Sequence, residues 1–195
     1  MPLPPGETAL LTLRLHGTVP AATARELNAQ LREAQATGAG PRLTQKRLFA
    51  QLDAVLDRAP IGQRYFENEH MAEVLAGELM MLEETGFVVH GFAILPNHFH
   101  LLLHLPARSS LSFAKALDLL HLRTEQQCRR LVRPKLPPEA PFWHPGWLEV
   151  PLLDAAELTR ALAYVQGNAR AAGLPPRYQQ WPYAPEGHAP GPGIT

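Results

Sequence analysis

Three histidines at even-numbered positions, His98, His100 and His104, are the side chains of this sequence best placed to bind a metal ion. Successive side chains of a strand point to opposite faces, so a strand over 98–105 would put all three on one face. His98 and His100 would lie about 7 Å apart and could share a divalent cation, whereas His104 would lie about 13 Å from His100, too far away. The alternative is a row of partly exposed polar histidines.

A tyrosine and an asparagine near the end of the chain form a second possible reactive group. Tyr164 and Asn168 are four residues apart, so on a helix they project side by side, with Arg160 one turn earlier on the same stripe. Aliphatic residues fall on a different face, about 120° away; they are Leu158, Leu162, Val165, Ala169 and Ala172. The helix would therefore pack through its aliphatic face and present the polar stripe elsewhere. The alternative is a boundary tyrosine whose hydroxyl faces water.

These two motifs resemble those of one enzyme family. Residues 96–102 (PNHFHLL) are similar to the signature strand of HUH single-tyrosine transposases, in which a hydrophobic residue separates two metal-binding histidines. Residues 164–174 (YVQGNARAAGL) resemble the nucleophile helix of that family. Residues 14–20 (RLHGTVP) and the Phe142-Trp143 pair narrow the likeness to the REP-associated tyrosine transposase (RAYT) branch, over roughly residues 8–183.

The resemblance implies a specific chemistry. His98, His100 and Asn168 would hold Mg²⁺ or Mn²⁺, and Tyr164 would attack phosphorus in single-stranded or hairpin DNA. The products would be a 5′-phosphotyrosine and a free 3′-hydroxyl, and strand transfer would follow without ATP. A phenol of ordinary pKa, about 10, is protonated at neutral pH, so some group must activate it. The sequence does not identify that group.

Two departures from the family pattern leave a second interpretation open. The family often has proline directly after the helix asparagine, where this chain has Ala169, and an acidic–histidine pair where this chain has Glu149-Val150. A domesticated protein that binds structured DNA without cleaving it is therefore an alternative. A metal-dependent hydrolase using His98 and His100 is another, but the sequence shows no carboxylate near the histidines to act as its base.

The hydrophobic pattern predicts an α+β fold, a ferredoxin/RRM-like antiparallel sheet with helices packed on it and the histidine strand central. Strands are expected at 8–15, 87–95, 98–105 and 147–152, and helices at 21–36, 43–58, 70–85, 110–132 and from Asp154, an N-cap, to Gly173. Residues 1–183 would form one domain with a helical insertion at about 21–58, and residues 184–195 a Pro/Gly-rich tail.

Composition and charge limit the possible partners. The 195 residues are 46% hydrophobic and 18% charged, without an apolar run long enough to cross a membrane or a signal peptide, which predicts a cytoplasmic globular protein. The lone cysteine, Cys128, is expected to be buried. Net charge is zero, but residues 101–135 hold seven basic and two acidic side chains. The oligomeric state, monomer or homodimer, is left open.

Several residues are expected to contact DNA. Lys115, Arg123 and Arg130 share one stripe of the 110–132 helix, whose other side should carry Phe113, Leu117, Leu120, Thr124 and Leu131 into the core. A solvated helix surface would look the same. Arg14, Arg160 and Arg170 are further candidates, and bases could stack on Trp143, Trp147 or Trp181.

Overall fold

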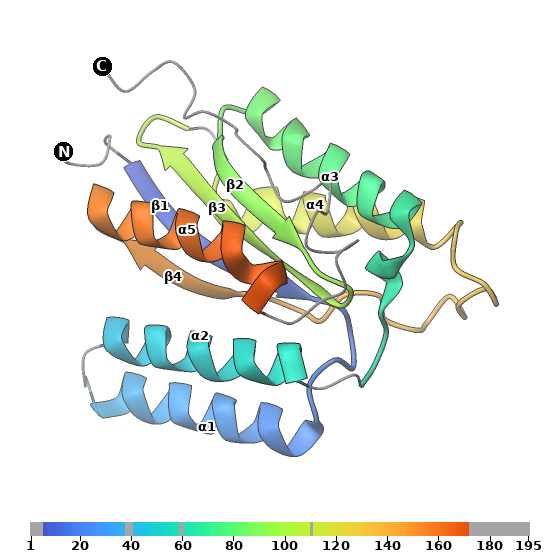
Figure 1. Ribbon diagram of the computed structural model, residues 1–195, viewed down its shortest axis with the longest axis horizontal. Coiled ribbons are helices and arrows are strands. Elements are labelled where there is room, and N and C mark those ends of the chain that lie inside the picture. The colour runs from blue at the N-terminus through green and yellow to red at the C-terminus, as the bar shows by residue number, and fades with distance from the viewer. Residues whose placement is uncertain (1–5, 38–40, 59–60, 110, 172–195) are drawn as a thin grey trace.

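A four-stranded antiparallel sheet organises the molecule, in the order β2-β3-β1-β4 (Figure 1). The computed structural model describes residues 6–37, 41–58, 61–109 and 111–171, apart from the side chains of 31, 34–35, 37, 41–42 and 169–171. The strands are β1 (Gly6–Arg14), β2 (Val88–Ile94), β3 (His98–Pro106) and β4 (Leu148–Leu152). The histidine strand, β3, lies between β2 and β1, as the sequence predicts.

Helices cover both faces of the sheet. In Figure 1, α3 (Glu69–Glu84) and α4 (Phe113–Cys128) lie on one face and α5 (Ala155–Ala171) on the other. The helices α1 (Ala21–Thr37) and α2 (Pro41–Arg58) run side by side next to β4, and a short 3₁₀ helix, η1 (Tyr65–Glu67), precedes α3. The α+β arrangement of sheet and packed helices is therefore confirmed.

Alternation along β3 divides its side chains between two cores. Phe99, Leu101 and Leu103 are fully buried in the larger core, together with residues of α3 and α4. Leu102 points the other way, into the smaller core beneath α5. Burying each such side chain stabilises the fold by about 1.5–3 kcal/mol. Hydrophobic burial thus fixes which face of β3 the histidines occupy.

The helix ends follow the capping signals of the sequence. Asp154 Oδ1 accepts a hydrogen bond from the backbone N–H of Glu157 at 2.7 Å, and the Glu157 carboxylate accepts one from the N–H of Leu153. Gly86, with φ +90°, lies just after α3 and takes a backbone conformation that other residues rarely adopt. These caps fix where α3 stops and α5 starts.

The prediction for the helix at 110–132 is wrong at its end. The helix α4 ends at Cys128, after which Leu131 N–H bonds to the Cys128 carbonyl and Arg130 N–H to the Gln127 carbonyl. These tighter i→i−3 bonds rotate the chain. Leu131 is consequently exposed and Val132 is buried in its place. Cys128 itself is a buried free thiol, as expected.

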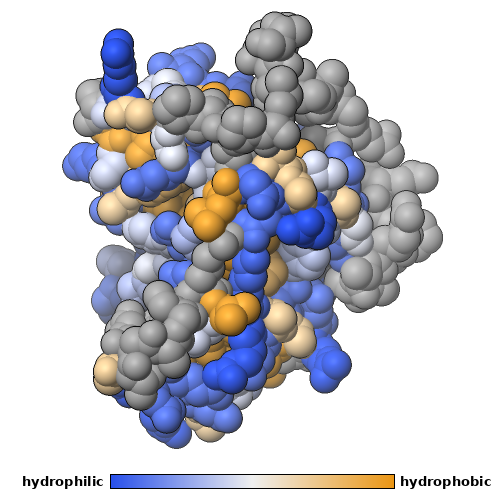
Figure 2. Space-filling view, turned by 90° about the vertical axis from the view of Figure 1, so that its left-hand side faces the viewer, coloured by the Kyte–Doolittle hydropathy of each residue, from blue (hydrophilic) through white to orange (hydrophobic). Residues whose placement is uncertain are grey.

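The part of the surface in Figure 2 that the structure describes is mainly hydrophilic, with hydrophobic residues in small patches. Scattered patches of this kind are normal for a surface in water. Among the described residues, no helix has the length and hydropathy to span a bilayer. The predicted domain end at 183 and the tail at 184–195 lie outside the described residues, so the domain division stays a prediction.

Candidate metal and nucleophile site

Two elements far apart in the sequence bring three potential metal ligands together. Asp53 comes from α2, and His98 and His100 come from β3. One ligand atom from each lies within 4.8 Å of the others, so the three side chains are close enough to bind a metal ion. Both histidines are at most 1% exposed. The cluster therefore lies between the sheet and the α2 helix.

Neighbouring side chains hold the two imidazole rings in place. His98 Nδ1 lies 2.7 Å from Asn97 Oδ1, an acceptor, so Nδ1 carries the proton. His100 Nδ1 lies 2.9 Å from the hydroxyl of Thr12, its cross-strand partner on β1. In each ring Nδ1 has a hydrogen-bond partner, whereas Nε2 has none among the described residues. This is the arrangement by which a second hydrogen bond orients a metal-ligating histidine.

Buried polar atoms without a partner identify the centre of the site. They include Asp53 Oδ1, His98 Nε2, His100 Nε2 and Asn168 Oδ1, none of which has a hydrogen-bond partner among the described residues. Asp53 Oδ1 and His100 Nε2 are 3.0 Å apart, but without hydrogen-bond alignment. Buried polar groups in folded proteins are nearly always satisfied. Two imidazole nitrogens and two oxygens left open fit a divalent cation.

The ionisation states suit this role. Burial lowers the pKa of His98 to about 3, with a smaller contribution from His100, so the ring is neutral and its Nε2 lone pair is available. Burial raises the pKa of Asp53, but the close approach of His100, followed by the hydrogen bond from the Tyr164 hydroxyl, outweighs it and holds that pKa below its usual value. Asp53 is therefore ionised at neutral pH.

A second carboxylate lies one turn further along α2. Asp57 Oδ1 is buried and has no hydrogen-bond partner in the described structure. Burial, followed by the charge of Asp53, raises the pKa of Asp57 to about 6. The two carboxylates thus differ, because the partners of Asp53 keep its pKa low, whereas Asp57 takes up a proton near pH 6.

Tyr164 of α5 completes the site. Its hydroxyl donates a hydrogen bond to Asp53 Oδ2 and accepts one of 3.0 Å from Asn168 Nδ2. Its ring lies 5.4 Å from the ring of His100, and Phe49 of α2 packs against both rings. Burial, followed by the charge of Asp53, raises the pKa of Tyr164 far above its ordinary value. The phenol is therefore protonated, and its O–H donates a hydrogen bond to Asp53.

The other predicted site residues lie at different distances from this centre. His104 shares the face of β3, but its Nδ1 pairs with the Thr8 hydroxyl at 2.8 Å and it is not part of the Asp53 group. Arg160 is exposed on α5. The backbone at 170 belongs to α5, whereas the side chain of Arg170 lies outside the described residues.

The expected DNA-contacting stripe lies across the sheet from the site. The helix α4 packs on the larger core, whereas Tyr164 packs on the smaller one. Lys115 and Arg123 are exposed there, and Arg123 Nη1 is 3.8 Å from a carboxylate oxygen of Glu78; Arg130 follows the helix and is also exposed. A DNA strand at Tyr164 would have to pass around the sheet to reach them.

Two aromatic or basic candidates are less accessible than expected. Trp143 is 6% exposed and donates its indole N–H to the Thr124 hydroxyl at 3.1 Å, so it belongs to the core and is not free to stack on bases. Arg14 is 8% exposed, inside a cavity and not on the open surface. Trp147 is half-buried, and Trp181 lies outside the described residues.

Sequence reasoning missed Asp53. The objection that no carboxylate lies near the histidines was therefore wrong. A signal was present: Phe49, Asp53 and Asp57 follow one another at intervals of four and so share one face of a helix. Two acidic residues beside an aromatic one, on a helix that also carries the buried Leu48 and Leu56, mark a face that meets other protein groups.

Comparisons with known proteins find a similar solved structure but no matching family. No family model matches the chain, and no curated protein matches it. Among solved structures, a REP-associated tyrosine transposase bound to a REP hairpin is similar over 92% of this chain and 76% of that chain, with 14% identity and a TM-score of 0.48. A likeness this distant does not assign the chain to a family, so a proposal for its function has to rest on the site.

Proposed function

We propose that the protein cleaves and rejoins single-stranded or hairpin DNA through a covalent 5′-phosphotyrosine formed on Tyr164. The observation that carries this proposal is the hydrogen bond from the Tyr164 hydroxyl to Asp53, beside two histidines with open Nε2 atoms. A nucleophile, a proton acceptor and metal ligands in mutual contact are the components that such a reaction needs. The sequence resemblance supports the same assignment.

In this proposal Asp53 has a different role for each oxygen. Oδ2 accepts the Tyr164 proton as the phenolic oxygen bonds to phosphorus, and the bond to the 3′ oxygen breaks and leaves a 3′-hydroxyl after protonation from solvent. Oδ1 faces the histidines, with which it would hold the metal. Asn168 positions the Tyr164 hydroxyl through Nδ2 and has Oδ1 available as a further ligand.

Mg²⁺ or Mn²⁺ suits a donor set of carboxylate and amide oxygens with imidazole, and when bound it would supply charge stabilisation at the scissile phosphate. The negative backbone of the DNA would be bound by exposed cations. Arg160 and Arg170 belong to the same helix as Tyr164, and Lys115, Arg123 and Arg130 could contact a longer strand that passes around the sheet. Arg14 lies apart from these exposed cations, in a cavity beside the histidines.

A second candidate is favoured by the same carboxylate. Asp53 could act as base for a water molecule, which would make the protein a metal-dependent hydrolase of phosphodiesters. The two candidates differ in one product: only the tyrosine reaction leaves protein bound to DNA. A binding protein that does not cut would release neither fragment nor adduct.

The test is incubation with end-labelled hairpin DNA carrying single-stranded flanks, in Mn²⁺, followed by a denaturing gel. We expect a labelled adduct with wild type, none with Tyr164→Phe, and full adduct with the control Tyr65→Phe, because Tyr65 stacks on Phe142 away from the site. Adduct formation by Tyr164→Phe would contradict the assignment. Cleaved DNA without any adduct would favour the hydrolase.

A further inference from the structure

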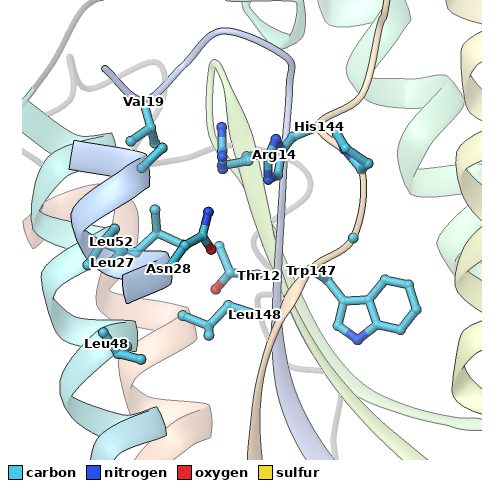
Figure 3. Close-up of a pocket in the computed structure, with 13 residues that line it drawn as sticks. Thr12, Arg14, Val19, Leu27, Asn28, Leu48, Leu52, His144, Trp147 and Leu148 are labelled. Carbon is cyan, nitrogen blue, oxygen red and sulfur yellow. The ribbon is translucent and has the colours of Figure 1, made fainter. Parts of the chain in front are cut away.

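A cavity of about 200 Å³ lies next to the candidate site, between the α1–α2 pair and the β1–β4 edge of the sheet (Figure 3). Two of the residues that line it belong to β1: Thr12, which bonds to His100, and Arg14, which pairs across the strands with His98. Directly opposed residues of antiparallel strands share one face, with Cβ atoms about 5 Å apart. The cavity therefore adjoins the two histidines.

Arg14 is a buried cation that has no acidic partner among the described residues. The residue is 8% exposed, and its guanidinium donates a long hydrogen bond of 3.4 Å to the Thr18 hydroxyl. Among the described residues that line the cavity, none is acidic. Burial lowers the pKa of Arg14 to about 10, so the guanidinium is still charged at neutral pH. A desolvated cation is costly unless something accepts its hydrogen bonds.

The walls of the cavity favour a flat, largely apolar occupant. They are formed by aliphatic side chains of α1, α2, β4 and the β1–α1 connection, namely Val19, Leu27, Leu48, Leu52 and Leu148. In Figure 3 the guanidinium of Arg14 and the amide of Asn28 lie toward the space between helix and strand, whereas the indole of Trp147 points away from it. The cavity thus has a polar end and apolar sides.

The volume limits the ligand to one small group. Sites for drug-sized molecules are about 300–1,000 Å³, so 200 Å³ suits a single ring system. An internal phosphodiester has a sugar on each side and would have to bring both sugars in. A base hangs from the strand by one bond and can rotate out of a stack into a pocket. The shape therefore selects a base over a backbone phosphate.

We infer that this cavity binds one unpaired guanine of the DNA strand, with Arg14 donating to its O6 and N7. Guanine presents two adjacent acceptors on that edge, which match the paired N–H groups of a guanidinium, whereas adenine and cytosine present an amino donor there. The inference rests on the proposal that the protein acts on single-stranded DNA, and it adds a base preference next to the reacting phosphate.

The test measures binding alone, in EDTA, so that no cleavage occurs. Fluorescein-labelled dT11 is compared by anisotropy with the same strand carrying one central guanine, adenine or 7-deazaguanine. We expect the guanine strand to bind wild type about tenfold more tightly than dT11, and the adenine and 7-deazaguanine strands to lose most of that gain. Equal affinity of wild type for dT11 and the guanine strand would overturn the inference.

Variants locate the preference. Arg14→Ala should bind both strands as wild type binds dT11, whereas Arg25→Ala, which removes an exposed charge from α1, should keep the preference. If Arg14→Ala does not fold, Asn28→Trp, at a solvent-exposed position of α1 facing the cavity, should fill it and abolish the preference. Guanine preference that persists in the folded variants, or an equal loss of affinity for dT11 and the guanine strand in Arg14→Ala, would contradict a base pocket; the latter would indicate a phosphate contact.

This experiment and the adduct assay fail independently. A wild type that prefers guanine but forms no adduct would retain the pocket and refute the phosphotyrosine proposal. A wild type that forms adduct without any preference for guanine would refute the pocket and retain the phosphotyrosine proposal.

Discussion

The hydroxyl of Tyr164 donates its hydrogen bond to the carboxylate of Asp53, a residue 111 positions earlier in the chain. The contact joins the last described helix to a helix that the sequence suggested was merely an insertion. A salt bridge of 2.7 Å between Lys46 and Glu157 joins the same two helices. The helix α2 is therefore part of the candidate site, because it supplies the carboxylate that accepts the hydrogen bond of the phenol.

Asp53→Asn should slow adduct formation by about 10²–10⁴-fold, the usual contribution of a positioned acid or base. The amide keeps the size of the side chain but accepts a proton poorly. The measurement is single-turnover adduct formation on labelled hairpin DNA. Asp57→Asn is the matched control, one turn away on α2, and should react at nearly the wild-type rate. Equal rates for Asp53→Asn and wild type would exclude Asp53 as the proton acceptor.

Mn²⁺ should stabilise the wild-type protein, and EDTA should reverse the effect. A ligand that binds only the folded state adds about 2.7 kcal/mol at a hundred times its Kd. Thermal unfolding with increasing Mn²⁺ measures this directly. His98→Ala and His100→Ala should lose the shift, because each removes an open Nε2 atom. His104→Ala, on the same strand face but bonded to Thr8, should retain it; loss of the shift there would enlarge the ligand set.

Stability should fall as the pH drops from about 6.5 toward 4. Burial lowers the pKa of His121 to about 4, against a smaller opposing effect of Asp118, and its ring stacks on Trp143. The unfolded state therefore takes up a proton first, and the contribution of His121 is complete above the unfolded pKa and lost below it. Urea unfolding at pH 7 and 5 should show a smaller drop for His121→Phe, by about 1–2 kcal/mol. His70→Phe, an exposed control on α3, should behave as wild type.

Replacing Lys115, Arg123 and Arg130 together by glutamate should weaken DNA binding if a strand passes around the sheet to α4. Each phosphate contact on single-stranded DNA contributes about 0.7 to the slope of log affinity against log salt, so three lost contacts should flatten it by about 2. Anisotropy titrations at several salt concentrations give this slope. Hairpins with long and short flanks should differ, because a short flank would not reach α4. A titration that overlays wild type would show that the stripe is only solvated.

Much of the fold was predictable because local sequence patterns determine it. The alternation in β3 and the caps at Gly86 and Asp154 depend on neighbours in the sequence. The face of β3 on which His98 and His100 lie follows from the burial of Phe99 and Leu101 on the opposite face. These features need no knowledge of where distant elements pack.

The docking of α2 was not predictable in that way. Helical periodicity shows that Asp53 shares a face with Phe49, but it does not say which strand that face meets. The position is set by long-range contacts, such as Phe49 with His100 and Tyr164. The burial of Arg14 has the same origin, because the cavity around it forms only when α1 and α2 pack beside β1 and β4.

Side chains on the two faces of β3 are under different evolutionary constraints, one set by folding and the other by chemistry. Phe99, Leu101 and Leu103 are retained by any constraint that keeps the protein folded. His98 and His100 are different, because each has a buried Nε2 atom without a partner in the described structure, and such an atom lowers stability. A copy kept solely as a scaffold would drift first at positions 98 and 100. Both positions are histidine here, with Asp53 and Tyr164 around them.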